Sequence, residues 1–308
     1  MPRIVITEFM DETALAGFPT EWDVAYEPSL VDDRKAMLNA IAEADAVIVR
    51  NKTQADAELL DAAPRLRAVG RLGVGLDNID VPACQARGIA VLPATGANAA
   101  SVAEYVIAAS LLLVRGAFEA TDLITAGAWP RAALGKGGEI GGRTLGLLGL
   151  GTIAQEVARR ASALGMEVIA YDPYRPSDDA AWGMAEEVSF DALVERGDVL
   201  SLHVPLTDTT RGLIGANALA RMKPEAVLIN TARGGIVDEA ALMDALRTGR
   251  LGGAALDVFD SEPPVDPAAF TNVPNLILTP HIAGVTSEAN GRVSELTVAN
   301  VRRVLAEQ

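Results

Sequence analysis

The sequence contains very little cysteine, histidine and aromatic side chain, and each shortage narrows the classes of protein to consider. Its 308 residues include one cysteine, two histidines and 4% aromatic residues. The single cysteine, Cys84, cannot form an internal disulfide, and we interpret it as a small structural residue. We also predict no metal site. Half of the residues are hydrophobic and most of these are aliphatic, which is typical of alternating strands and helices around a large core.

Long apolar runs and an excess of positive charge are also missing. The longest apolar run, 105–114, is too short to cross a bilayer. Glu8, Asp11 and Glu12 interrupt the N-terminus before the apolar stretch of a signal peptide could form, so we expect a cytoplasmic protein. The net charge of −15 argues against nucleic acid and anionic membranes as partners. Such a charge fits either an ordinary solvated surface or adaptation to a salt-rich cytoplasm. Because the whole chain is negatively charged, an anionic substrate must be attracted by cationic side chains at its binding site.

The strongest single motif is a glycine pattern between an apolar strand and a helix. The run 145–148 predicts a strand that is buried on both faces. Gly149, Gly151 and Ala154 follow in the G-x-G-x-x-G/A pattern, and helical spacing begins at Thr152. Unpaired amides at a helix N-terminus attract anions. The turn is therefore predicted to bind the pyrophosphate of a dinucleotide.

The residue that ends the next predicted strand indicates which dinucleotide. The strand 167–171 is followed by Asp172, about 20 residues after the glycines. A carboxylate at this position can accept hydrogen bonds from both hydroxyls of an adenosine ribose and repels the 2′-phosphate of NADP. The sequence therefore favours NAD. Arg175 is the one nearby feature that opposes this choice.

The order of the predicted elements indicates two α/β domains with parallel sheets. Two domains are also expected for a chain of this length. One strand–helix alternation fills the first hundred residues, and a second begins near residue 145. A long buried helix, 99–114, is expected to cross between the domains. The expected strands are 4–7, 22–26, 46–49, 66–69, 145–148, 167–171, 198–202, 226–230, 253–256 and 276–278; the other expected helices are 11–16, 34–44, 55–62, 152–164, 189–196, 238–248 and 287–307.

Side chains suited to chemistry follow three later strands of the second predicted sheet. Arg233, which would suit a carboxylate, comes directly after one strand, Glu262 lies in the loop after the next, and His281 follows a third. The carboxyl ends of parallel strands meet at one edge, where ligands of open α/β sheets bind. Each residue alone also fits a structural role, as a partner of carbonyls, a turn cap or a packed histidine. The second histidine, His203, lies in a similar loop.

Longer motifs occur in a fixed order: VGRLGVGLDNID (69–80), NAASVAEY (98–105), GRTLGLLGLGTIA (142–154), NTARGGIVDEAAL (230–242), ALDVFDSEPP (255–264) and TPHIAG (279–284). With them the sequence resembles the D-isomer-specific 2-hydroxyacid dehydrogenases, and within these the phosphoglycerate dehydrogenase branch. The resemblance implies two Rossmann-like or flavodoxin-like parallel-sheet domains with an active-site cleft between them. It implies a substrate-binding domain of residues 1–97 and 284–308, an NAD-binding Rossmann domain of residues 98–283, NAD in the cleft, and a homodimer built from the NAD-binding domains.

The resemblance also assigns roles to single residues. It implies that His281 is the general acid/base, that Glu262 orients it and favours its protonated form, and that Arg233 holds the substrate's carboxylate and carbonyl oxygen. The implied cofactor contacts are Gly149, Gly151, Thr152, Ile153, Asp172, Val204, Pro205, Thr210, Thr231, Ala232, Asp257 (near the nicotinamide) and Gly284; the implied substrate contacts are Arg50, Asn51, Arg71, Gly73, Val74, Gly75, Asn78 and Arg233.

Two arginines of the first predicted domain bear on the substrate. In the phosphoglycerate branch, positions matching Arg50 and Arg71 line the pocket for an anionic group on C3, although both also fit ordinary surface charge. We therefore predict a 2-hydroxyacid with a second anion at C3. The regulatory domain of that branch is not present before the last residue, Gln308, so we prefer (S)-3-sulfolactate, oxidised to 3-sulfopyruvate, over D-3-phosphoglycerate. Hydroxypyruvate or glyoxylate reduction is the third choice.

Two related classes of protein differ in activity. The formate dehydrogenase variant of the family carries glutamine where this chain has Glu262, and is disfavoured for that reason. The C-terminal-binding corepressors share the fold, sense NADH and act as scaffolds, and they can retain the same three polar residues. The sequence shows no disordered tails, so we favour an enzyme.

Overall fold

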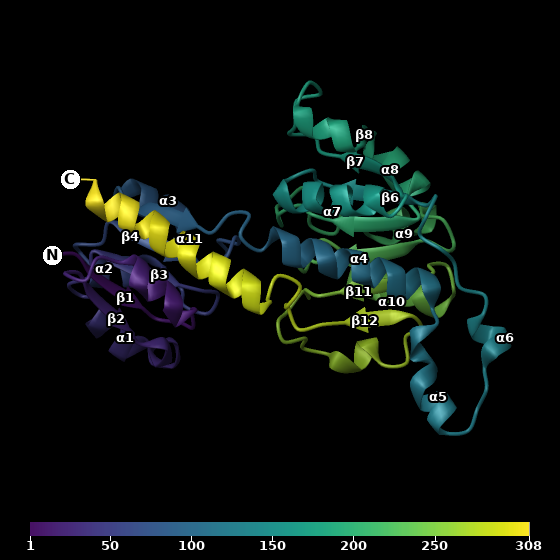
Figure 1. Ribbon diagram of the computed structural model, residues 1–308, viewed down its shortest axis with the longest axis horizontal. Coiled ribbons are helices and arrows are strands. Elements are labelled where there is room, and N and C mark those ends of the chain that lie inside the picture. The colour runs from purple at the N-terminus through teal and green to yellow at the C-terminus, as the bar shows by residue number, and fades with distance from the viewer. Residues whose placement is uncertain (308) are drawn as a thin grey trace. The chain divides into compact units, whose positions relative to one another are not determined.

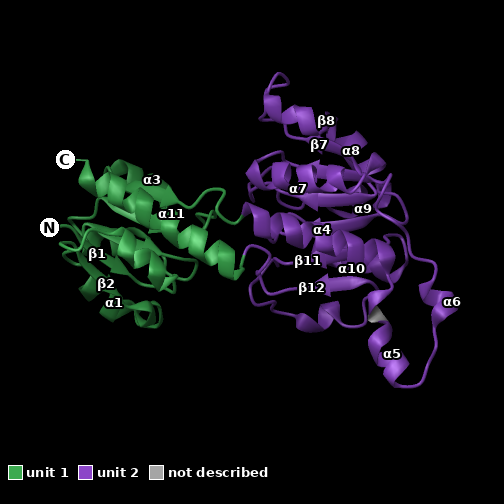
Figure 2. Ribbon diagram, viewed as in Figure 1, with its two compact units in different colours: residues 1–98, 285–308 green, residues 99–284 purple. Residues whose placement is uncertain are grey.

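The computed structural model describes residues 1–307 and divides into two compact units (Figure 2). Unit 1 comprises Met1–Asn98 and the chain from Val285 onward, and unit 2 comprises Ala99–Gly284. Each unit is built around its own parallel β-sheet with helices on both faces. The predicted fold class, two parallel-sheet α/β domains, is thus confirmed. No helix within residues 1–307 is long and apolar enough to cross a membrane.

Among the described residues, unit 1 has a five-stranded sheet in the order β2-β1-β3-β4-β5. The central strand, β3, is apolar and fully buried, as expected for a strand covered on both faces. The strands are β1 Arg3–Ile6, β2 Asp23–Tyr26, β3 Ala46–Val49, β4 Ala68–Arg71 and β5 Ala90–Pro93; the helices are α1 Arg34–Ala40, α2 Ala57–Ala62 and α3 Val81–Ala86, with 3-10 segments η1 Glu12–Gly17 and η2 Pro28–Asp32.

The C-terminal helix, α11 (Ser287–Ala306), completes unit 1, and Figure 1 shows it in yellow across that sheet. Thr286 begins the helix by accepting a hydrogen bond from the amide of Ala289 at 3.0 Å. Val298 and Val301 on its apolar face are buried in the same core as the β-strands. The packing is close, since a Cβ at Gly70 would lie 2.8 Å from Val301 Cγ2. Unit 1 is therefore made of two separate stretches of chain.

Unit 2 has a seven-stranded sheet in the order β12-β11-β10-β9-β6-β7-β8, counted over the part of the chain that the structure describes. Its strands are β6 Thr144–Leu148, β7 Glu167–Tyr171, β8 Glu186–Glu187, β9 Val199–Leu202, β10 Val227–Asn230, β11 Gly253–Leu256 and β12 Leu276–Leu278. Its helices are α4 Ala99–Arg115, α5 Thr121–Thr125, α6 Arg131–Leu134, α7 Thr152–Ala163, α8 Phe190–Arg196, α9 Ala216–Arg221 and α10 Glu239–Arg247, with 3-10 segments η3 Phe118–Ala120, η4 Ala180–Met184 and η5 Pro267–Phe270.

The two faces of the unit 2 sheet have separate cores. Helices α4 and α7 cover one face, where Val106, Leu113 and Val157 are buried with alternate strand residues. Helices α8, α9 and α10 cover the other, with Leu193 and Leu242 in its core. The long helix predicted at 99–114 is confirmed as α4. The expectation that it crosses between the domains was wrong, because α4 lies entirely within unit 2 and packs in the core of that unit.

Most expected strands are present within a residue or two, but several local expectations differ. The helix expected at 11–16 is the 3-10 segment η1, whose N-cap is Asp11. The helix expected at 34–44 ends at Ala40. Strands β5 and β8 and helices α3 and α9 were not expected, and neither was the excursion at 116–140 that carries α5 and α6 and extends away from the sheet (Figure 1).

Candidate active site

The predicted cofactor and catalytic residues of unit 2 lie along one edge of its sheet. All strands are parallel, so the loops that follow them emerge at the same, carboxyl edge. Read along the sheet from β7 through β6 and β9 to β12, these loops carry first the dinucleotide motif and then the polar residues. In that order they present Asp172 after β7, Gly149 and Gly151 after β6, Val204 and Pro205 after β9, Thr231, Ala232 and Arg233 after β10, Asp257 and Glu262 after β11, and His281 and Gly284 after β12.

The glycine turn leaves room for a phosphate at the start of α7. Gly149 has a φ of +86°, and a Cβ there would lie 2.9 Å from the carbonyl oxygen of His203. Gly151 is the N-cap of α7, and no side chain of residues 1–307 caps the helix at this end. A Cβ at Gly151 would meet no atom within 4 Å. The amides of Thr152 and Ile153, in the first turn, are therefore placed to bind a pyrophosphate.

The carboxylate of Asp172 is fixed beside that turn. It accepts hydrogen bonds from the amide of Leu150 at 3.0 Å and from the amide of Tyr174 at 3.1 Å. Arg175 donates to the carbonyl of Leu150 at 2.8 Å and to Asp179 Oδ2 at 2.5 Å. The guanidinium of Arg175, the one feature that argued against NAD, is thus bound to Asp179 and to the glycine turn. Negative charge at the ribose position fits NAD.

Cofactor choice gives a first prediction at Asp172. Changing Asp172 to serine should lower kcat/KM for NAD about 10- to 100-fold, because hydrogen bonds to a charged group contribute about 1.5–3 kcal/mol. The same change should raise kcat/KM for NADP by removing the repulsion of its 2′-phosphate. Initial rates with both cofactors check this, together with dissociation constants for each. A wild-type enzyme that used both cofactors equally well would contradict the role of Asp172.

The loops after β9 and β10 continue this edge. Thr210 Oγ1 donates to the carbonyl of Pro205 at 2.7 Å and closes the turn that carries Val204 and Pro205, two of the predicted cofactor contacts. His203 Nε2 lies 2.9 Å from Ser201 Oγ, and burial lowers the pKa of His203 to about 4, so it is neutral at pH 7. Thr231 Oγ1 is buried without a hydrogen-bond partner among the described residues. A buried hydroxyl of this kind fits a bound ligand.

Arg233 is carried by a loop whose backbone is held from within. Asn230 Oδ1 accepts from the amide of Ala232 at 3.0 Å, and Asn230 Nδ2 donates to the carbonyl of Arg233 at 2.9 Å. Arg233 Nη1 donates to the carbonyl of Ala232 at 2.6 Å. A Cβ at Gly234 would lie 1.8 Å from the carbonyl oxygen of Phe259. The arginine loop therefore packs directly against the segment that leads to Glu262.

His281 and Glu262 form a hydrogen-bonded pair. His281 Nδ1 lies 2.7 Å from Glu262 Oε2, while Glu262 Oε1 accepts from the amide of Phe259 at 3.2 Å. Their side chains are 48% and 38% exposed, so a small molecule can reach them. With Nδ1 directed at the carboxylate, Nε2 is the ring nitrogen that can exchange a proton with a substrate.

The loop of His281 is held in a strained conformation by Asp257. His281 has a φ of +55°, a region that costs a residue other than glycine about 1–3 kcal/mol. Asp257 is 1% exposed, and its carboxylate accepts from Thr279 Oγ1 at 2.6 Å and from the amides of Ile282 and Ala283, each at 2.8 Å. This carboxylate therefore fixes the histidine loop, and its contact with the nicotinamide stays a prediction.

The predicted substrate residues of unit 1 lie at the carboxyl edge of that unit's own sheet. Strands β3 and β4 are neighbours with Val49 opposite Arg71, so Arg50 and Arg71 leave the same edge. Arg71 Nη1 donates to the carbonyl of Leu72 at 2.5 Å. In the following loop Gly73 donates its amide to the Arg71 carbonyl at 2.8 Å, whereas the amides of Val74 and Gly75 have no acceptor within residues 1–307. Those two amides are suited to a carboxylate.

Two asparagines predicted to touch substrate have other hydrogen bonds here. Asn78 is 7% exposed, and its Nδ2 donates to the carbonyl of Thr53 at 2.6 Å. The amide of Asn51 donates to Glu8 Oε2 at 3.2 Å. Both therefore support the loop after β3, and their contact with substrate stays a prediction. Glu8 was missed as a site residue because a single acid after the strand β1 matches no motif.

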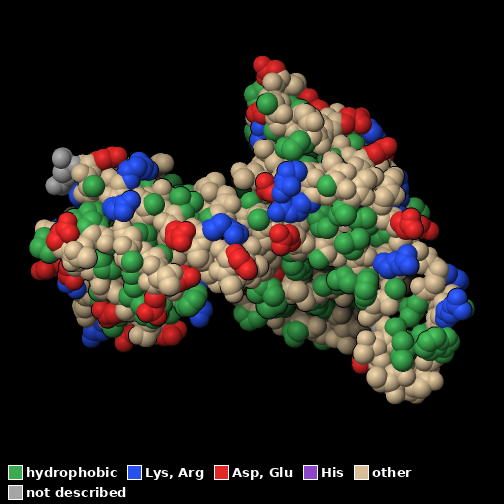
Figure 3. Space-filling view, in the orientation of Figure 1, with side chains coloured by type: hydrophobic (Ala, Val, Ile, Leu, Met, Phe, Trp, Pro, Cys, Tyr) green, Lys and Arg blue, Asp and Glu red, His purple; other side chains and the backbone are tan. Residues whose placement is uncertain are grey.

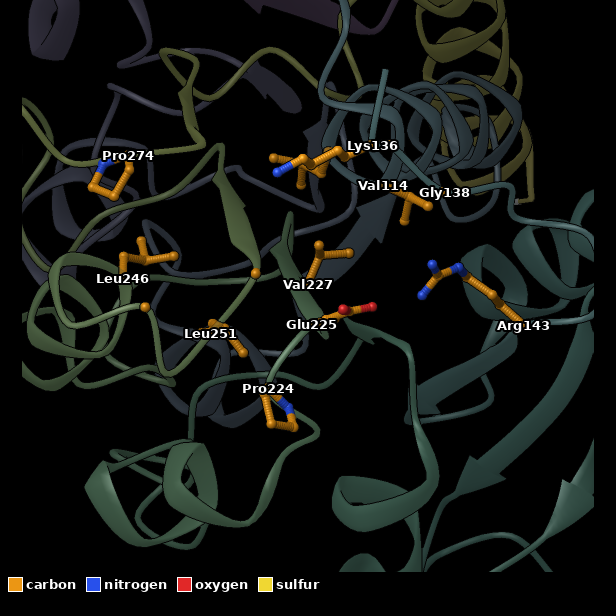
Figure 4. A pocket seen from close by; sticks show the side chains of 14 residues that line it. Val114, Lys136, Gly138, Arg143, Pro224, Glu225, Val227, Leu246, Leu251 and Pro274 are labelled. Atoms are coloured by element: carbon orange, nitrogen blue, oxygen red, sulfur yellow. The ribbon is translucent and has the colours of Figure 1, made fainter. Parts of the chain in front are cut away.

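One cavity of the described residues lies away from these side chains. It has a volume of about 430 Å³ and is lined by Lys136, Arg143, Glu225 and Val227 among others (Figure 4). Arg143 and Val227 stand at the amino ends of β6 and β10, so this cavity opens at the edge opposite the glycine turn. A second cavity, of about 410 Å³, is lined by Tyr171, Asp172 and Ser189 and adjoins the predicted ribose position.

The chain is similar over nearly its whole length to known proteins. A family model described as D-isomer specific 2-hydroxyacid dehydrogenase, NAD binding domain, matches residues 107–283. The (S)-sulfolactate dehydrogenase of Chromohalobacter salexigens is 55% identical over 306 residues, 99% of each chain. A D-3-phosphoglycerate dehydrogenase of Mycobacterium leprae is 42% identical; the match covers 99% of this chain and 57% of that enzyme. The TT0316 protein of Thermus thermophilus superposes with a TM-score of 0.89 at 34% identity, covering 99% and 97% of the chains.

Three features at one sheet edge define an NAD-dependent oxidoreductase of the Rossmann type: the glycine turn, the acidic ribose position and the histidine–glutamate pair. The chain belongs to the D-isomer specific 2-hydroxyacid dehydrogenase family, and it is an NAD-dependent 2-hydroxyacid dehydrogenase.

Proposed function

We propose that this enzyme oxidises (S)-3-sulfolactate to 3-sulfopyruvate with NAD. The observation that carries the proposal is that Arg50 and Arg71 leave neighbouring strands at the same sheet edge, in a chain whose net charge is −15. Two guanidinium groups at one edge suit a second anion on the substrate, since arginine binds sulfonate and phosphate oxygens through a planar fork of donors. The 55% identity to an (S)-sulfolactate dehydrogenase supports the sulfonate.

The polar residues of unit 2 suit the chemistry of this oxidation. When bound, NAD supplies the carbon that accepts the hydride from C2 of the hydroxyacid. His281 Nε2 takes the proton of the C2 hydroxyl, and Glu262 holds the ring through Nδ1. Arg233 binds the substrate's carboxylate and stabilises the oxygen that becomes a carbonyl. In the reverse direction, the same imidazole returns the proton to that oxygen.

We also propose roles and an assembly for the two units. Unit 1 is the substrate-binding domain and unit 2 the NAD-binding domain, in an enzyme that works in the cytoplasm, where NAD is available. The proposed assembly is a homodimer that forms through unit 2. Apolar side chains support the dimer: in the view of Figure 3 hydrophobic groups gather over α4 and the excursion at 116–140. Those exposed by more than a third include Leu111, Leu112, Phe118, Leu123, Ile124 and Trp129.

The substrate proposal is tested by comparing kcat/KM across related acids. The panel contains both enantiomers of sulfolactate, D-3-phosphoglycerate, D-glycerate and D-lactate. The arrangement named D or (R) in phosphoglycerate is named (S) in sulfolactate, because the sulfur-bearing carbon outranks the carboxylate. The wild-type enzyme should therefore use (S)-sulfolactate and spare the (R) form. A preference for D-3-phosphoglycerate or D-glycerate would instead reveal one of the alternative activities.

Variants of the two arginines test the second-anion pocket. Arg50→Ala and Arg71→Ala should each lower kcat/KM for (S)-sulfolactate about 10- to 100-fold, the scale of one charge-assisted hydrogen bond, and change D-lactate much less. Arg87→Ala is the matched control, because Arg87 is a partly exposed arginine of the same unit that pairs with Asp61. If D-lactate were used as well as the dianions and neither variant discriminated between them, the pocket would not exist.

A further inference from the structure

A buried carboxylate lies beneath the loop that carries Arg50. Glu8 is 4% exposed. Its Oε1 accepts hydrogen bonds from the amides of Arg50 at 2.7 Å and Thr53 at 2.9 Å. Its Oε2 accepts from the amides of Asn51 at 3.2 Å and Lys52 at 3.1 Å. Four successive backbone N–H groups therefore converge on one side chain.

The carbonyl side of the same loop is held as well. Asn78 Nδ2 donates to the carbonyls of Thr53 at 2.6 Å and Arg50 at 3.4 Å. The hydroxyls of Thr7 and Thr53 lie 3.0 Å apart, and both residues are buried. The four amides and two of the carbonyls of the loop thus have hydrogen-bond partners, which stabilise the backbone conformation that the structure shows.

The side chain of Arg50 extends from this fixed backbone. Its guanidinium lies 5.6 Å from the ring centroid of Phe9, and its Nη2 donates to Asn290 Oδ1 at 3.0 Å. The four loop amides already bond to Glu8. They cannot also bind an anion, so an anion can be recognised by this loop only through side chains, and Arg50 provides the guanidinium.

The charge of Glu8 has the wrong sign to attract an anionic substrate. Burial is the largest influence on this carboxyl and raises its pKa, but the loop amides lower it, and the resulting pKa is below the ordinary value. Glu8 is therefore ionised. A negative charge next to Arg50 weakens the attraction of that arginine for anions. What Glu8 contributes to substrate binding must then be geometric.

We propose that Glu8 is a positioning residue for substrate recognition, which fixes the loop 50–53 so that Arg50 presents its guanidinium to the second anion of the substrate. The proposal rests on the substrate function proposed above. It distinguishes two effects of opposite sign. Loss of position weakens binding of the dianion, whereas loss of the Glu8 charge alone strengthens it.

Two variants of Glu8 separate these effects. Glu8→Gln keeps the shape but removes the charge and turns an amide NH2 toward loop donors. Glu8→Asp keeps the charge but withdraws the carboxylate by one methylene. If position matters, both variants should raise KM for (S)-sulfolactate about tenfold, the scale of one lost hydrogen bond to a charged group, while kcat and KM for NAD change little. If charge alone matters, Glu8→Gln should lower this KM and Glu8→Asp should leave it unchanged.

Controls distinguish this role from a purely structural one. Glu12→Gln, at an exposed glutamate nearby, should change neither KM. Because Glu8 acts through Arg50, adding Glu8→Gln to Arg50→Ala should raise KM little further. Glu8 variants with a lowered melting temperature but a normal or lower KM for the dianion would overturn the proposal. If Arg50→Ala itself left that KM unchanged, the proposed anion pocket would fail first, which is a separate result. Should Glu8→Gln not fold, Glu8→Asp decides the question.

Discussion

Replacing His281 by alanine should lower kcat by about 10²- to 10⁴-fold, the usual scale for one positioned proton-transfer group. The Nδ1 atom of His281 lies 2.7 Å from Glu262 Oε2, which leaves Nε2 for the substrate hydroxyl. The substitution removes that proton acceptor and leaves the Arg233 loop in place. Steady-state kcat at saturating NAD and substrate is the measurement, and an unchanged dissociation constant for NAD shows that unit 2 is intact.

Glu262→Gln is the informative companion to this variant. Glutamine can still accept a hydrogen bond from Nδ1 but carries no charge, so the loss of kcat should be smaller than in His281→Ala. His203→Gln controls for the other histidine, whose pKa of about 4 makes it a weak base that is unprotonated at neutral pH. Near-normal turnover by His281→Ala would transfer the proton-transfer role to His203 or to water.

The features that the sequence predicted best are those that depend on one local pattern. Apolar runs of four or five residues, such as 46–49 and 145–148, became fully or largely buried parallel strands, because only such strands need no polar face. Polar residues directly after those runs came to the carboxyl edge for the same reason. Strand β5 was missed because Pro93 ends it, and β5 lies at the sheet edge, where proline is tolerated.

The supports of the site could not be predicted, because they join residues far apart in the sequence. Glu8 bonds to a loop more than 40 residues away, and nothing next to it in the chain marks it as buried. Asp257 was expected at the nicotinamide from the family resemblance, but which groups its oxygens accept from depends on how the loop of His281 folds back. Helix α3, in contrast, could have been predicted from the sequence, since Asp80 caps the helix and Pro82 lies in its first turn.

Arg233→Ala should lower kcat/KM by about 10²- to 10³-fold, the cost of removing one donor aimed at developing charge. Both kcat and KM should suffer, because the guanidinium holds the substrate's carboxylate and also faces the oxygen whose charge changes. The loop supports this reading: Asn230 bonds to its backbone on both sides, and Gly234 lets it pack on the segment leading to Glu262. The arginine therefore emerges from a backbone that has little freedom to adjust.

That rigidity makes the lysine variant the sharper test. Lysine retains the charge but is a single point donor, so Arg233→Lys should recover little of the activity lost in Arg233→Ala. Arg196→Ala is the control in the same unit, where an exposed arginine pairs with Glu186 and activity should be unchanged. Full activity in Arg233→Lys would show that charge alone suffices at this position. A loss in KM without a loss in kcat would show that Arg233 binds the carboxylate and leaves the reacting oxygen to another group.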